Sequence, residues 1–179
     1  MSQMLSDPRP DWLFYTALEL RFCIEQTLRT YLELLQVEWT KPLAKLYRAK
    51  ELKQAILNAE PEFVEKLAFV DVIVRAVHPI GVFQLDLDKL NTYYGRLGAY
   101  LHAPLYQDKT VRDPNWWQSF SDLLVEIKAY LKEVLRHPMA TFHPTEEGWD
   151  MFKKWKAGEV TDDEVREDFL DGVRINDSA

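Results

Sequence analysis

Apolar residues recur at intervals of three and four along most of this 179-residue chain, and this spacing constrains the fold more than any other feature. Between residues 87 and 101 the pattern is complete, with apolar side chains at Leu87, Leu90, Tyr94, Leu97 and Leu101. Residues with this spacing lie on one side of an α-helix. The valine and isoleucine residues of segment 69–74 would also suit a strand, but the helical spacing holds throughout 61–78. We therefore predict an all-α fold.

Prolines and capping residues set the predicted helix boundaries. Asp11 and Asp113 precede helices as N-caps, Thr161 and Glu164 form a capping box, and Gly158 ends a helix. The expected helices span about 12–37, 43–58, 61–78, 86–103, 114–136, 146–156 and 162–172. We expect a loose N-terminal lead-in over 1–11, a bundle of four to five helices over 12–137, and an acidic, aromatic-containing tail over 138–179 that forms a C-terminal pair of short helices.

Charge is distributed unevenly along the chain. The net charge is −7, and residues 145–179 alone contain eleven acidic and five basic residues. The remaining residues are almost neutral, so nucleic-acid binding is not excluded, but no strong basic field indicates it. No uncharged apolar run is long enough to span a membrane, and the N-terminus lacks the pattern of a secretory signal. We predict a cytoplasmic protein with no membrane partner.

The sequence contains none of the common cofactor or metal motifs. There is no glycine-rich phosphate loop, no CxxC and no HExxH, and the four histidines are scattered. We therefore expect no cofactor and no metal ion. The single cysteine, Cys23, fits a reducing compartment and is expected to be a small buried hydrophobic residue rather than a nucleophile.

Small residues line the side of helix 86–103 that lies opposite its apolar stripe. Gly95, Ala99 and Ala103 follow one another at intervals of four, and Arg96 and His102 flank them. A glycine inside a helix costs about 1 kcal/mol relative to alanine. A helix that accepts this cost on its outer face is expected to let a second backbone come close. The pattern predicts a homodimer with Gly95, Ala99 and Ala103 in its interface.

Arg96 and His102 are the candidate catalytic residues. They lie about 120° apart on an ideal helix, so a single helix cannot direct both at one atom. A second copy packed on the small-residue face would bring two arginines and two histidines into one cleft. A guanidinium can hold a phosphate and an imidazole can transfer a proton near neutral pH, which suits metal-independent RNA cleavage. The alternative is an arginine on a solvated face and a histidine that caps a helix end.

At this point the sequence resembles the HEPN family (higher eukaryotes and prokaryotes nucleotide-binding). The resemblance covers roughly residues 12–135 and rests on the spacing of Arg96 and His102, the long first helix ALELRFCIEQTLRTYL and the helix order. It implies a small all-α bundle, often dimeric, of the kind found in toxin–antitoxin, phage-defence and CRISPR systems, either as an endoribonuclease or as an inactive partner. The family's catalytic pair would correspond to Arg96 and His102. Leu97 stands where active members usually carry a polar residue.

Other charged residues offer candidate supporting roles. Arg21, Glu25 and Arg29 are spaced by four, either as a surface ion-pair ladder or with Glu25 orienting Arg96 or His102. The only basic cluster lies between residues 41 and 53. Its candidate RNA contacts are Lys45, Arg48 and Lys53, unless the cluster is simply a solvated helix face.

Three large aromatic residues in the acidic tail form a candidate docking face. Trp149, Phe152 and Trp155 are spaced by three, which would suit a protein partner, although the same rings could pack on the protein's own bundle. This leaves an alternative function open, namely a non-enzymatic helical interaction module such as an antitoxin, inhibitor or assembly subunit.

Overall fold

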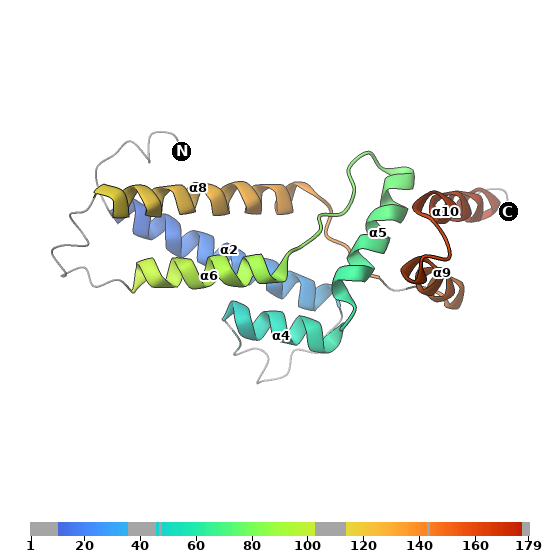
Figure 1. Ribbon diagram of the computed structural model, residues 1–179, viewed down its shortest axis with the longest axis horizontal. Coiled ribbons are helices and arrows are strands. Elements are labelled where there is room, and N and C mark those ends of the chain that lie inside the picture. Colours follow the sequence, from blue (N-terminus) through green and yellow to red (C-terminus); the bar gives the residue numbers. More distant parts are fainter. Residues whose placement is uncertain (1–10, 36–45, 47, 103–113, 143, 177–179) are drawn as a thin grey trace. The chain divides into compact units, whose positions relative to one another are not determined.

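The computed structural model describes residues 11–35, 46, 48–102, 114–142 and 144–176 of the chain. Within these residues the protein forms helices and no strand, which confirms the predicted all-α class, including the helical assignment of segment 69–74 (Figure 1). The helices are α2 (Asp11–Leu34), α4 (Ala49–Ala59), α5 (Phe63–Val77), α6 (Leu87–Leu101), α8 (Pro114–Arg136), α9 (Glu146–Ala157) and α10 (Asp162–Asn176).

The ends of the last two helices follow from local sequence chemistry. The Thr145 hydroxyl caps α9 by accepting a hydrogen bond from the Gly148 N–H at 3.3 Å. Gly158 ends α9 with a left-handed backbone at φ 73°, which a residue with a side chain rarely adopts. At the start of α10 the Thr161 N–H donates to Glu164 Oε2 at 2.7 Å, and the Glu164 N–H donates to Thr161 Oγ1 at 3.3 Å. The capping box and the glycine stop are therefore confirmed.

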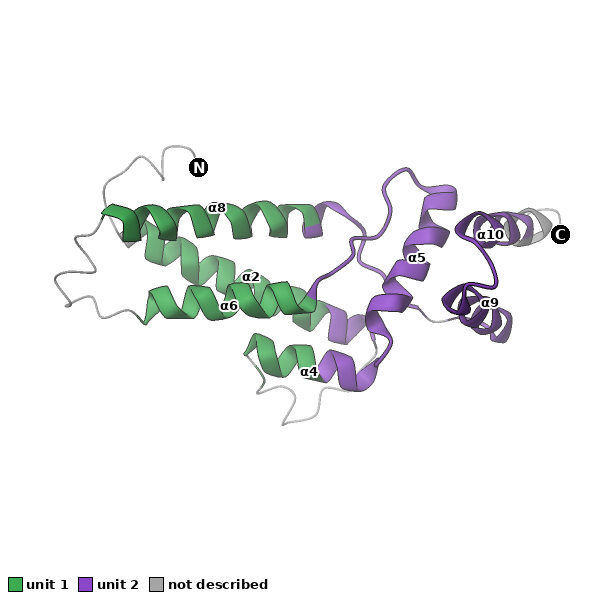
Figure 2. Ribbon diagram, viewed as in Figure 1, with its two compact units in different colours: residues 1–30, 39–54, 87–133 green, residues 31–38, 55–86, 134–179 purple. Residues whose placement is uncertain are grey.

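The chain divides into two compact units (Figure 2). Unit 1 consists of residues 1–30, 39–54 and 87–133, and unit 2 consists of residues 31–38, 55–86 and 134–179. The sequence led us to expect a bundle that ends at residue 137 and a tail that follows it. The units instead group α5 with α9 and α10, because an apolar face of α5 packs against both of these helices.

Unit 1 is held together by the apolar faces of α2, α6 and α8. Arg21 of α2 donates a hydrogen bond to the Tyr94 hydroxyl of α6 at 2.6 Å, and the rings of Phe14 and Phe120 join α2 to α8 at 5.5 Å between centroids. Within unit 1, the buried hydrophobic residues of these helices are Ala17, Leu20, Ile24, Leu28, Leu87, Leu90, Tyr93, Tyr94, Leu97, Phe120, Leu123, Leu124, Ile127 and Leu131.

The core of unit 2 contains the aromatic residues of the tail. Phe152 is 1% exposed and lies among Phe69, Val72 and Val165, while Trp149 and Trp155 pack against the same cluster half-buried. The rings of Phe69 and Trp155 are 5.3 Å apart between centroids. The candidate docking residues Trp149, Phe152 and Trp155 therefore pack on the protein's own helices, and Phe152 has almost no surface left for a partner.

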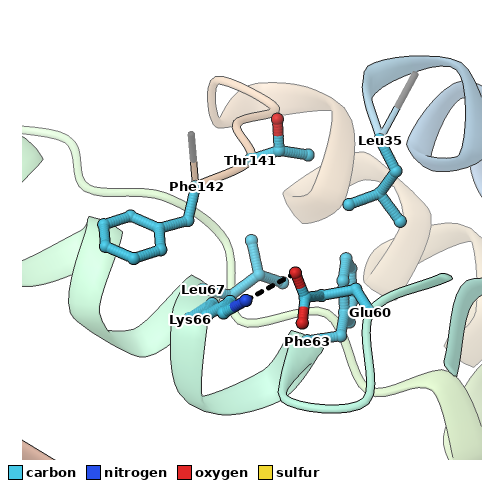
Figure 3. A pocket seen from close by; sticks show the side chains of 7 residues that line it. All are labelled: Leu35, Glu60, Phe63, Lys66, Leu67, Thr141 and Phe142. Atoms are coloured by element: carbon cyan, nitrogen blue, oxygen red, sulfur yellow. Dashed lines mark hydrogen bonds and ion pairs between the residues drawn. The ribbon is translucent and has the colours of Figure 1, made fainter. Parts of the chain in front are cut away.

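A buried lysine stabilises the same unit. The Lys66 ammonium donates to Glu60 Oε2 at 2.6 Å (Figure 3). It also lies 4.2 Å from the centre of the Trp149 ring. Lys66 is 6% exposed, so its charge requires both the carboxylate and the ring. The adjacent cavity of about 10 Å³ has the size of a single water molecule. This cluster is consistent with a structural role rather than with a ligand site.

Candidate functional site

The outer face of α6 presents the predicted site residues to solvent. Gly95, Arg96, Ala99 and His102 are all exposed, whereas Leu97 on the opposite side is fully buried. A Cβ added at Gly95 would meet nothing within 4 Å. The small-residue face is thus open at Gly95 and Ala99 in the single chain, and Ala103 lies outside the described residues. Leu97 is committed to the core, which explains why this position is apolar.

A tyrosine cluster fixes one flank of α6 against α2. The Tyr94 hydroxyl receives a hydrogen bond from Arg21 and donates one to Glu25 Oε1 at 3.0 Å. The Arg21 guanidinium also lies 4.1 Å from the centre of the Tyr94 ring. Burial raises the pKa of Tyr94, and the bond to Glu25 adds to this effect while Arg21 opposes it. The hydroxyl is therefore protonated at neutral pH and acts as a donor to Glu25.

A second cluster fixes the other flank of α6 against α8. The Tyr93 hydroxyl donates to Glu126 Oε1 at 2.7 Å, and Arg96 Nη1 lies 3.6 Å from Glu126 Oε2. Tyr93 is 2% exposed, and burial together with the bond to Glu126 raises the pKa of its hydroxyl far above the ordinary value. The two clusters hold α6 by its flanks, so the face between them stays directed outward.

Arg96 and His102 are accessible but are not brought together by α6. They are six positions apart along the helix, which is a rise of about 9 Å. The side chains of Arg96 and Glu126 are both half-exposed, so this ion pair is weak and a phosphate could compete for the guanidinium. The backbone N–H of His102 donates to the Gly98 carbonyl, so His102 continues the last turn of α6. One copy of the chain thus offers a phosphate ligand and a proton-transfer group at separate points.

The described contacts of Glu25 are with Arg21 and Tyr94. No contact among the described residues joins Glu25 to Arg96 or His102. The residue that does pair with Arg96 is Glu126, which the sequence analysis missed. Apolar spacing shows which face of helix 114–136 is buried, but it does not show which polar neighbour meets an arginine on another helix.

The candidate RNA contacts have different surroundings. Lys53 forms an ion pair with Asp88, which joins α4 to α6 within unit 1. Arg48 is exposed at the start of α4, and Lys45 lies outside the described residues. The Lys53 pair neutralises part of the predicted basic cluster, whereas Arg48 and Lys50 are both exposed.

The sequence analysis also missed an exposed apolar stripe on α2. Tyr15, Leu18 and Phe22 are 57%, 54% and 56% exposed, and their spacing of three and four places them on one face. Cys23 beside them is exposed, so the prediction that it is buried was wrong. The apolar side of α2 runs through Ile24 instead, and Cys23 falls one residue outside it. The regular apolar spacing of α2 follows its buried side through Ala17, Leu20 and Ile24, but α2 also carries apolar residues on its exposed side.

Neither a metal site nor a membrane span emerges from the described part of the chain. Its His, Cys, Asp and Glu side chains nowhere gather in threes as they would around an ion. Among the described helices, none combines the length and apolar character needed to cross a bilayer. In comparisons with known proteins, no family model, no curated protein and no solved structure matches the chain.

Proposed function

We propose that this protein is a HEPN-like dimeric endoribonuclease of a prokaryotic defence or toxin–antitoxin system, acting through Arg96 and His102. The observation that carries the proposal is the outer face of α6, where both residues are exposed beside an open strip of small residues. A second copy seated on this strip would complete a site that one chain leaves divided.

The chemistry follows from the two side chains. In a dimer, each half of the cleft would hold an RNA phosphate through a bidentate guanidinium contact from Arg96. One imidazole would accept the proton of the ribose 2′-hydroxyl as its oxygen attacks the adjacent phosphorus. The departing 5′-oxygen would take up a proton from water, which leaves a 2′,3′-cyclic phosphate, so each half of the cleft needs one arginine and one histidine. No metal ion is needed in this sequence of steps, because the guanidinium groups balance the phosphate charge.

Cleavage of a labelled single-stranded RNA in the presence of a chelator tests the proposal. His102→Ala should lower the rate by at least about 100-fold, since proton transfer contributes that much to such reactions. Arg96→Ala should lower it comparably. His78→Ala is the matched control, because His78 is another exposed histidine at a helix end, in unit 2. An RNA with a 2′-deoxy group at the cleaved position should resist the protein, and cleavage that persists in both α6 variants would refute the assignment.

The exposed stripe on α2 favours one alternative, a non-enzymatic helical interaction module. Tyr15, Leu18 and Phe22 form an apolar face that the described part of the chain leaves exposed, and such faces commonly mark protein interfaces. In this alternative Leu18→Glu abolishes association with a protein partner, while no RNA is cleaved and Arg96→Ala and His102→Ala leave that association intact. The endoribonuclease proposal instead predicts that RNA is cleaved and that Arg96→Ala and His102→Ala abolish this cleavage, whereas Leu18→Glu leaves it intact.

A further inference from the structure

Unit 2 contains a pocket of about 490 Å³ that is distinct from the residues of α6. Its walls come from α5, residues 141, 142, 144 and 145, α9 and α10. The apolar part is lined by Phe69, Val70, Ile73, Met151, Val165 and Phe169. Pockets of this volume with mostly apolar walls typically hold small organic molecules.

One end of the pocket depends on the close approach of Pro144 to Gly148 in the first turn of α9. A Cβ at Gly148 would lie 2.9 Å from the Cβ of Pro144, so only glycine allows this approach without a shift. Thr145 is held at the start of the helix by its cap to the Gly148 N–H. Met151, one turn further along, lines the pocket with a side chain that adapts readily to the shape of a ligand.

The charged residues that line the pocket, among those that the structure describes, are both acidic. Glu147 and Asp168 line it, both are exposed, and neither forms an ion pair with a described residue. No basic residue of the described chain lines the pocket, and on α9 and α10 Arg166 pairs with Asp163 at 2.7 Å and Lys153 with Asp150 at 3.3 Å. The mouth of the pocket therefore attracts cations.

We propose that this pocket binds a small organic cation with an apolar body and one ammonium or guanidinium group. The apolar body would contact Ile73, Met151 and Phe169, and the cation would lie between Glu147 and Asp168. This inference does not depend on the proposed RNA cleavage, because none of its residues belongs to α6.

The test uses three probes with the same apolar body, namely biphenylmethylamine, biphenylmethanol and biphenylcarboxylate. Calorimetric titration of the 179-residue chain at neutral pH should rank the amine first and the carboxylate last. Two exposed carboxylates should favour the amine over the alcohol by about fivefold. Amide chemical shifts should change in residues 141–151 and 165–169.

Paired variants separate the contribution of charge from that of the cavity. Glu147→Gln with Asp168→Asn should reduce the affinity for the amine to that for the alcohol. Glu146→Gln with Glu167→Gln is the matched control, since both residues are exposed on the same helices but do not line the pocket. Ile73→Trp should fill the pocket and abolish binding of both probes.

Three outcomes would overturn the proposal. The first is that no probe binds at about 1 mM. The second is that the amine and the carboxylate, or the amine and the alcohol, bind equally well to the unmodified protein. The third is that the shift changes lie outside the pocket.

Discussion

At the residue scale, Glu164 shows how one hydrogen-bonded carboxylate fixes the start of a helix. The Thr161 N–H and then its hydroxyl lower the pKa of Glu164 below its ordinary value of 4.5. As the pH falls, the unfolded chain therefore takes up this proton before the folded chain does. The contribution of Glu164 to the stability of the fold is complete above about pH 4.5, and it is lost as the pH falls through the pKa of Glu164 in the folded protein.

Glu164→Gln should therefore flatten part of the pH dependence of stability. Between about pH 5 and pH 3 the melting temperature of the variant should fall less than that of the unmodified protein, because Gln does not titrate. Thermal melts followed by circular dichroism at several pH values would measure this. Glu167→Gln, another exposed carboxylate of α10, is the control and should keep the original dependence. If the melting temperatures of Glu164→Gln and the unmodified protein changed with pH in parallel, the cap would not contribute to the pH dependence of stability.

Residue-level features were predictable from sequence only where the partners are neighbours. The cap at Thr161 and the stop at Gly158 depend on residues within one turn, so their spacing revealed them. The pairing of Arg96 with Glu126 joins two helices, and no local pattern encodes it. The exposure of Cys23 was missed for a related reason, since α2 is apolar on both sides.

At the scale of the element, α6 combines a buried stripe with an open face of small residues. Glycine destabilises a helix interior, yet a methyl group at Gly95 would meet no atom within 4 Å in the single chain. Packing among the described residues of one chain therefore does not account for the glycine. Under our proposal, the close approach of a second copy does.

Gly95→Ala should consequently have opposite effects on folding and on assembly. The isolated chain should gain about 0.5–1 kcal/mol of stability from the better helix propensity of alanine. Self-association should weaken, because the added methyl group separates the two backbones. Chemical denaturation at low concentration and analytical ultracentrifugation at high concentration measure the two effects. Gly98→Ala is a useful comparison, since its Cβ would lie in ordinary contact, 3.8 Å from Arg21. If Gly95→Ala left association unchanged, a different face would have to form the dimer.

At the scale of the whole molecule, the acidic C-terminal segment belongs to a folded unit. Its helices bury Phe69 and Val72 of α5, and Lys156 reaches back to Glu62 at 2.5 Å. The sequence predicted the two short helices of this segment closely, because their caps are local. The sequence could not decide whether the aromatic residues pack on the chain or on a partner, because both alternatives require the same amphipathic pattern.

Deleting residues 145–179 should lower thermal stability and expose an apolar surface on α5. Loss of contacts with Phe152 alone should cost about 3–5 kcal/mol, as is usual when a buried aromatic ring is removed. Differential scanning calorimetry and the binding of a hydrophobic dye would measure the two effects. Val77→Ala serves as the control for unit 2, because Val77 is 59% exposed and its removal should change stability little. A truncated protein with unchanged stability and no dye binding would show that the segment does not support the fold.

The proposed RNA cleavage depends on whether two copies of the chain share one site. The distance between Arg96 and His102 along α6 means that a chain acting alone cannot direct both side chains at one phosphate. The central claim is therefore that each active half of the dimer combines Arg96 of one copy with His102 of the other.

Mixing two inactive variants tests this claim most directly. Arg96→Ala and His102→Ala chains with different affinity tags would be expressed together, the mixed dimers quantified by mass spectrometry, and RNA cleavage measured. If the site is shared, each mixed dimer keeps one intact pair, and random assembly should restore roughly a quarter of the unmodified activity. Mixed dimers that form in the expected amount, yet cleave RNA no faster than the two variants measured separately, would contradict the account.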